Sequence, residues 1–143
     1  MTAALTPVAL DAATVPLSGT TLIEASAGTG KTHTIATLFV RLLLEHGHKV
    51  SGILVVTYTR AATAELRARI RKRVVEALDV LTRMHEGTIR AQDEARDEAL
   101  WVIARASLAR GTFERDRKRL IDAVRSFDLA AISTIHGFCQ RVL

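Results

Sequence analysis

A glycine-containing loop between a short apolar run and a long apolar segment constrains the fold of this chain most. Residues 20–24 (TTLIE) have the character of a short strand, and Gly28 and Gly30 then interrupt the pattern. The segment 32–46 (THTIATLFVRLLLEH) that follows has the apolar residues of a buried helix. Residues 53–58 (ILVVTY) form a continuous β-branched run, typical of a strand covered on both faces. The sequence therefore predicts a β-α-β unit.

The loop itself has the residues that phosphate binding requires. Gly28 and Gly30 allow the backbone to curl so that successive N–H groups point inward, and the start of the following helix adds its positive dipole end. In loops of this kind the lysine, here Lys31, reaches the β- and γ-phosphates, and the threonine, here Thr32, gives its hydroxyl to Mg²⁺. The pattern G-x-x-x-x-G-K-[ST] is matched at its last three positions, with Ala25 at the first. We therefore predict a nucleoside triphosphate site made by Ala25, Ser26, Ala27, Gly28, Thr29, Gly30, Lys31 and Thr32, with Lys31 and Thr32 as its catalytic residues.

The positive charge of the chain lies in its middle. Residues 1–59 hold three basic and three acidic side chains, whereas residues 60–127 hold sixteen basic and eleven acidic ones. The densest stretch is 60–73, where six arginines and lysines stand against the single acid Glu65. From charge alone this stretch is either a surface for a polyanion or a solvated helix face.

The same middle part is expected to be helical. Thr59 is placed to cap a helix whose apolar stripe consists of Leu66, Ile70, Val74, Leu78 and Leu81. Further helices are predicted at 89–109 and 112–127, a strand at 129–135 and a last helix at 136–143. We divide the chain into an irregular lead-in, 1–19, and one α/β domain, 20–143, with a helical insertion at 74–127.

The end of the predicted strand 53–58 meets the basic helix, which brings hydroxyls, an aromatic ring and several arginines together. Ligands bind at the carboxyl edge of a parallel sheet, which is where these residues would lie. Thr57 and Thr59 can donate hydrogen bonds to phosphate oxygens, and Tyr58 can stack on a base. This combination suits single-stranded nucleic acid that is bound without sequence specificity. Tyr58 is equally interpretable as an ordinary core residue at a strand end.

Three segments together resemble the UvrD/Rep-type superfamily 1A helicases. The loop at 25–32 is similar to motif I, residues 57–70 (TYTRAATAELRARI) to motif Ia, and residues 134–139 (TIHGFC) to motif Ib. The resemblance covers most of the chain, is densest at 22–70 and 128–143, and is strongest toward the helicase–nuclease members. It implies an incomplete motor domain with a P-loop, RecA-like parallel sheet and a helical insertion.

For function, the resemblance implies ATP-driven 3′-to-5′ translocation on single-stranded DNA, within an enzyme of DNA repair and recombination. Lys31 and Thr32 would serve ATP and Mg²⁺. The positions that match the DNA track of the family are Thr57, Tyr58, Thr59, His136 and Phe138, with Arg60 beside them. For His136, a hydrogen-bonded role in fixing the strand-to-helix turn remains open. The full-length helicase–nuclease would act on single-stranded and duplex DNA together with partner subunits.

Some features of the family are missing from these 143 residues. There is no D-E-x-Q segment, the acidic motif that holds Mg²⁺ and activates water, and Asp93-Glu94 lies in a charged segment without an apolar strand before it. The lead-in has no glutamine-bearing adenine motif either, so base selectivity is undetermined. We therefore expect the leading fragment of a longer protein, one that binds nucleotide weakly and does not unwind DNA alone.

Composition favours a cytoplasmic protein. The only cysteine, Cys139, cannot form an internal disulfide, and its apolar neighbours at helical spacing favour packing over reactivity. No export signal and no stretch long enough to span a membrane are evident. The alternatives to the helicase–nuclease interpretation are an AddA-type or plain UvrD-like repair helicase, a non-catalytic nucleic-acid-binding module and, least favoured, a P-loop small-molecule kinase.

Overall fold

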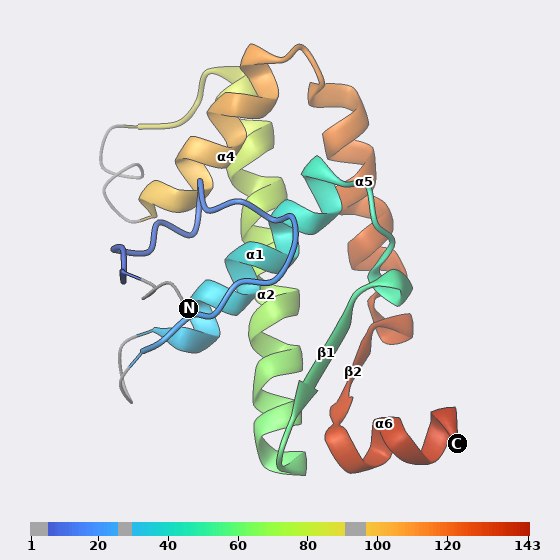
Figure 1. The fold of residues 1–143 in the computed structure, drawn as a ribbon. Helices are drawn as coiled ribbons and strands as arrows, with labels where there is room; N and C mark the ends of the chain where they lie inside the picture. The colour runs from blue at the N-terminus through green and yellow to red at the C-terminus, as the bar shows by residue number, and fades with distance from the viewer. Residues whose placement is uncertain (1–5, 26–29, 91–96) are drawn as a thin grey trace.

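Helices dominate the computed structural model, which describes residues 6–25, 30–90 and 97–143 (Figure 1). The helices are α1 (Lys31–Glu45), α2 (Arg60–Glu86), α4 (Glu98–Ala109), α5 (Phe113–Arg125) and α6 (Ile135–Val142). Two strands, β1 (Leu54–Thr57) and β2 (Ala131–Thr134), follow the short 3₁₀ helices η1 (Val50–Gly52) and η2 (Phe127–Leu129). The chain is thus a mixed α/β structure, as predicted, although its sheet is small. None of the described helices is long and apolar enough to cross a membrane.

The two strands pair in parallel, with Leu54 opposite Ala131 and Thr57 opposite Thr134. Parallel neighbours need a long crossover connection, which α2, α4 and α5 provide. The four residues of one strand pair in order with the four of the other, so both strands end at the same level. In Figure 1 both strands run downward and α1 runs upward, so the start of α1 and the carboxyl ends of the strands lie toward the same side of the picture.

The long helix α2 begins and ends at residues suited to those positions. The Thr59 Oγ1 accepts a hydrogen bond from the Ala62 N–H at 3.0 Å, and Gly87 closes the helix with a φ of 72°. Four residues of the predicted stripe are buried and Leu78 is partly buried, which confirms the helix, its cap and its apolar face. The helix runs unbroken through residue 74, where the insertion was predicted to begin.

The core lies where α1, α2, α4 and α5 meet. Fully buried side chains from each of these helices contact one another, among them Phe39, Ile70, Leu100 and Leu120. Phe39 also meets the ring of Phe127 edge-on, with centroids 6.3 Å apart. Burying a side chain of this size contributes about 1.5–3 kcal/mol. Most of the buried apolar surface therefore lies among the helices.

The described part of the lead-in, residues 6–19, has no helix or strand but is attached to α1. The buried guanidinium of Arg41 donates from Nη1 to the carbonyl oxygens of Ala12 and Val15, at 3.1 and 2.6 Å. Its remaining side pairs with Glu45 through two hydrogen bonds of 2.7 and 3.0 Å. Arg41 therefore connects an irregular segment to the helical core.

The predicted strand at 20–24 is wrong. These residues have no strand hydrogen bonds, and Leu22 is 76% exposed. A short apolar run becomes a strand only beside a partner that completes its backbone hydrogen bonds. Within the described residues the sheet consists of β1 and β2 alone, and 20–24 pairs with neither.

Two other predictions need correction. The helix expected at 89–109 begins at Glu98, because Asp97 caps it, while residues 88–90 are not helical and 91–96 lie outside the described residues. The strand expected to be covered on both faces is covered on one, since Leu54 and Val56 are 47% and 42% exposed. Val55 and Thr57, on the other face of β1, are half-buried. The remaining helices and strand begin and end within about two residues of the prediction.

Candidate functional site

The first turn of α1 carries the predicted catalytic residues. Lys31 is exposed and Thr32 is half-buried, directly after Gly30, whose φ of 84° is a left-handed conformation that favours glycine. Among the described residues no side chain caps this helix, and its first turn holds no acid, whereas α2, α4 and α6 each begin with a side-chain cap. The free N–H groups at the start of α1 are therefore suited to an anion.

Part of the predicted loop is not described. Ser26, Ala27, Gly28 and Thr29 lie outside the described residues, and Ala25, just before them, is half-buried. The described part of the site therefore consists of Ala25 and the turn from Gly30 to Thr32.

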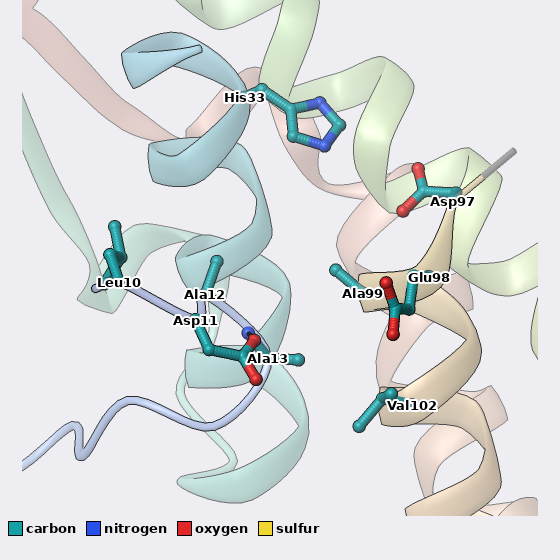
Figure 2. A pocket seen from close by; sticks show the side chains of 9 residues that line it. All are labelled: Leu10, Asp11, Ala12, Ala13, His33, Asp97, Glu98, Ala99 and Val102. Carbon is teal, nitrogen blue, oxygen red and sulfur yellow. Dashed lines mark hydrogen bonds between the residues drawn. The ribbon is translucent and has the colours of Figure 1, made fainter. Parts of the chain in front are cut away.

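A cavity of about 440 Å³ adjoins this turn (Figure 2). It lies between the lead-in, α1 and the start of α4. Its lining consists of Leu10, Asp11, Ala12, Ala13, His33, Asp97, Glu98, Ala99 and Val102. Figure 2 shows the imidazole of His33 directed from α1 toward Asp97. Because His33 follows Thr32 in the chain, the cavity is a neighbour of the predicted phosphate site.

A buried arginine joins α1, α2 and α4 behind this cavity. Arg73 donates from Nε and Nη2 to the Thr37 Oγ1, at 3.0 and 2.8 Å, and forms an ion pair with Asp97. The Thr37 hydroxyl in turn donates to the carbonyl oxygen of His33 at 3.0 Å. Asp97 also caps α4 by accepting from the Leu100 N–H at 3.3 Å. Burial raises the pKa of Asp97, but the hydrogen bond and charge of Arg73 outweigh it, so the pKa lies below its ordinary value.

Sequence analysis grouped Arg73 with the exposed cations of the basic stretch and missed this role. The signal was its position in the stripe of α2, since 66, 70, 73, 77 and 81 repeat at helical spacing. Arg67 also has a structural role, because its Nη2 donates to the carbonyl oxygens of Ala130 and Ile132 at 3.2 and 3.1 Å. Two of the six cations in 60–73 are therefore held by the fold. Arg60, Arg69, Arg71 and Lys72 are exposed.

At the carboxyl end of β1, the threonines and the tyrosine differ in their surroundings. The Thr57 hydroxyl donates to the Thr59 carbonyl at 3.1 Å and lies 2.6 Å from the Thr63 hydroxyl, while the Thr59 hydroxyl caps α2. Tyr58, between them, is 90% exposed, so its interpretation as a core residue is wrong. Tyr58 and the exposed Arg60 are the residues of this segment whose side chains are free to meet a ligand.

At the carboxyl end of β2, Thr134 fixes the turn into α6. Its Oγ1 accepts from the Gly137 N–H at 3.0 Å, a cap that sequence analysis did not identify. Thr134 rather than His136 therefore makes the hydrogen bond that fixes this turn; His136 is exposed and Phe138 is half-buried. Cys139 is exposed as well, so the prediction that it packs is wrong. Because Thr57 lies opposite Thr134, the fold brings the segments 57–60 and 134–138 to one edge of the sheet.

The similarity of the chain to known proteins defines its family. The chain matches the UvrD/REP helicase N-terminal domain over residues 5–143 and belongs to that family. Among individual proteins it is similar to the RecBCD enzyme subunit RecB. The RecB of Haemophilus influenzae is 44% identical over 94% of this chain, and that of Escherichia coli 41% over 94%. The RecB of Mycobacterium tuberculosis is 39% identical over 90% of the chain. The chain spans about 11% of the length of each of these relatives.

Proposed function

We propose that this chain is part of an ATP-dependent DNA helicase and exonuclease subunit of the RecB type, which acts in double-strand break repair and recombination. Membership of the UvrD/REP family and similarity to RecB support the class. The observation that carries the proposal is the edge of the sheet where the two motif-like segments end side by side, since Thr57 lies opposite Thr134. This proposal also includes 3′-to-5′ polarity, a RecA-like sheet that is completed by further strands, and the division of the chain at residues 20 and 74.

In this proposal ATP and Mg²⁺ bind at the start of α1. Gly30 leaves the first N–H groups of the helix without a side-chain cap, which suits the phosphates. The ammonium of Lys31 would pair with the β- and γ-phosphates, and the Thr32 hydroxyl would be a ligand of Mg²⁺. Residues 25–29 would complete the loop. When bound, ATP supplies the free energy that drives movement along DNA. The cavity beside His33 leaves room for another part of the nucleotide.

Single-stranded DNA would lie across the carboxyl edge of the sheet. The exposed ring of Tyr58 can stack on a base, and Arg60 can pair with a phosphate. His136 and Phe138 would contact the strand from the β2 side. The hydroxyls of Thr57 and Thr59 are already bonded within the fold, so their contribution is to hold Tyr58 in place. In the whole protein we further propose a nuclease domain, RecC- and RecD-like partner subunits and a cytoplasmic location.

The test is the substitution Lys31→Ala in the full-length protein, with Lys118→Ala as the matched control because Lys118 is an exposed lysine on α5. Lys31→Ala should lower DNA-stimulated ATP hydrolysis by at least about 100-fold, since charge stabilisation at the transferred phosphoryl group is lost. Duplex unwinding should stop, whereas Lys118→Ala should retain both activities. DNA binding should survive in both variants.

Equal ATP hydrolysis by Lys31→Ala and the wild type would contradict the nucleotide site. A wild-type protein that binds DNA without hydrolysing ATP would instead identify a non-catalytic binding module. The 143-residue chain alone should not unwind duplex DNA, and unwinding by it would contradict the view that the motor is incomplete.

A further inference from the structure

A second cavity, of about 560 Å³, lies at the end of the molecule away from the edge described above. It is bounded by the last turn of α1, by η1 and by the second half of α5. η1 precedes β1 and η2 precedes β2, so this cavity lies by the amino ends of the strands. It is therefore separate from the residues assigned to nucleotide and DNA.

The cavity has a positively charged rim. Lys49 and Arg125 are exposed, and neither has an acidic partner among the described residues. The one acid in its lining, Asp122, is paired with Lys118, whose Nζ lies 3.3 Å from the Asp122 Oδ2. Two cations at the rim are thus available to a ligand. A ligand with several carboxylates or phosphates would complement them.

A third cation is held in place by the fold. Arg119 donates from Nη1 to the Leu44 carbonyl at 2.8 Å, and its only acidic neighbour among the described residues, Asp116, is 4.0 Å away. A Cβ at Gly47 would lie 2.9 Å from its Nη2, so a larger residue there would displace the guanidinium. Arg119 therefore has a fixed position at the cavity wall, which lowers the entropic cost of binding an anion.

The remaining wall is aliphatic. Leu43 and Val50 are buried at its base, while Leu129 is 64% exposed at its rim. Among the described residues, no phenylalanine, tyrosine or tryptophan lines the cavity, and its one ring, the imidazole of His48, is stacked on that of His46 with centroids 5.7 Å apart. An apolar wall beside several cations instead matches a peptide with an aliphatic side chain between carboxylates.

We propose that this cavity binds an acidic segment of a partner protein, with one aliphatic side chain packed against Leu129 and flanking carboxylates paired with Lys49, Arg119 and Arg125. The surface is an assembly site, distinct from the sheet edge that faces DNA. Its binding is electrostatic at the rim and therefore weakens as salt rises.

The experiment uses the ¹⁵N-labelled 143-residue chain and three probes in an NMR titration. The probes are the acidic peptide Ac-EDLED-NH₂, its neutral counterpart Ac-QNLQN-NH₂ and the oligonucleotide dT8. The titration is repeated with Arg125→Glu and, as a matched control on the same helix, with Arg117→Glu, which is exposed but does not line the cavity. Circular dichroism and dispersed amide signals first establish that the 143-residue chain and both variants are folded, and the titration is made only on folded protein.

We expect the acidic peptide to shift the amide signals of residues 49–51 and 126–129, and the neutral peptide to leave them unchanged. Arg125→Glu should weaken binding about tenfold, because an attraction becomes a repulsion, and Arg117→Glu should change it less than about twofold. The proposal is overturned if the acidic peptide gives no shifts there, if both variants bind it equally well, or if dT8 shifts the same signals at lower concentration.

Discussion

The helical part of the molecule and the edge of its sheet differ in how completely they are packed. In α1, α2, α4 and α5, apolar side chains are buried in one core, and the buried Arg73 and Asp116 have hydrogen-bond partners. At the sheet edge, Tyr58 is exposed and α6 has no buried residue. The helical part gives the fold its stability, and the edge keeps side chains available for binding. Substitutions should therefore affect stability in the first region and binding in the second.

The largest effect on stability is expected from Arg73→Ala. The change leaves Asp97 without its buried partner and removes both bonds to Thr37. Removing one partner of a fully buried ion pair costs about 3–5 kcal/mol, and the loss here should lie at or below the lower end because the Asp97 side chain is 24% exposed. Urea unfolding should show this loss, while Arg71→Ala, on an exposed position of the same helix, should change the free energy of unfolding by less than about 0.5 kcal/mol. Equal midpoints for the two variants would show that the helical part does not depend on this pair.

A buried acid makes the same part of the molecule sensitive to pH. Asp116 accepts hydrogen bonds from Ser107 Oγ at 2.6 Å, Thr112 Oγ1 at 2.7 Å and Arg115 Nη2 at 3.1 Å. Burial raises the pKa of Asp116, but these hydrogen bonds outweigh it and hold the pKa below its ordinary value. The ionised form is therefore the one that the folded state stabilises.

Because the folded pKa of Asp116 is below the unfolded one, its contribution is present above the unfolded pKa, about 3.9, and is lost as the pH falls through the folded pKa. Asp116→Asn should cost about 1–3 kcal/mol at pH 7 by weakening these hydrogen bonds. Its free energy of unfolding should also fall less between pH 5 and pH 3 than that of the wild type, measured by urea unfolding at each pH. A steeper acid dependence in Asp116→Asn would contradict this account.

A smaller effect is expected at the boundary between the two regions, where Thr59 caps α2. Thr59→Ala should lower the free energy of unfolding by about 1 kcal/mol, because the first turn of α2 loses a hydrogen-bond acceptor. Thr59→Ser keeps the hydroxyl and should restore most of the stability. If alanine and serine behave alike in thermal unfolding, the cap does not contribute.

Local patterns in the sequence predicted most of the helices. The stripe of α2 with its threonine cap, the run that forms β1 and the start of α5 are signals carried by neighbouring residues, and the structure agrees with them. Long-range partners were less predictable. Residues 20–24 have strand character but no partner strand, and β1 was expected to be covered on a face that is exposed.

For the candidate site, sequence predicted the residues but not their surroundings. The pairing that places Thr57 opposite Thr134 depends on how the whole connection between β1 and β2 folds. The spacing of residues in the sequence could not show it. The pairing of Arg73 with Asp97 joins residues from different helices and could be suspected only from the place of Arg73 in the stripe. The exposure of Tyr58 distinguishes its two interpretations, and exposure is a property of the folded chain.

The substitution Tyr58→Ala in the full-length protein tests the contrast between the two regions most directly. Its affinity for single-stranded DNA and its thermal unfolding are measured on the same preparation. Since the ring is 90% exposed, the melting temperature should change by less than about 2 °C. DNA affinity should fall about tenfold or more, because stacking on a base is lost. Unchanged DNA affinity together with a lowered melting temperature would contradict the account that the helices stabilise the fold and the sheet edge binds DNA.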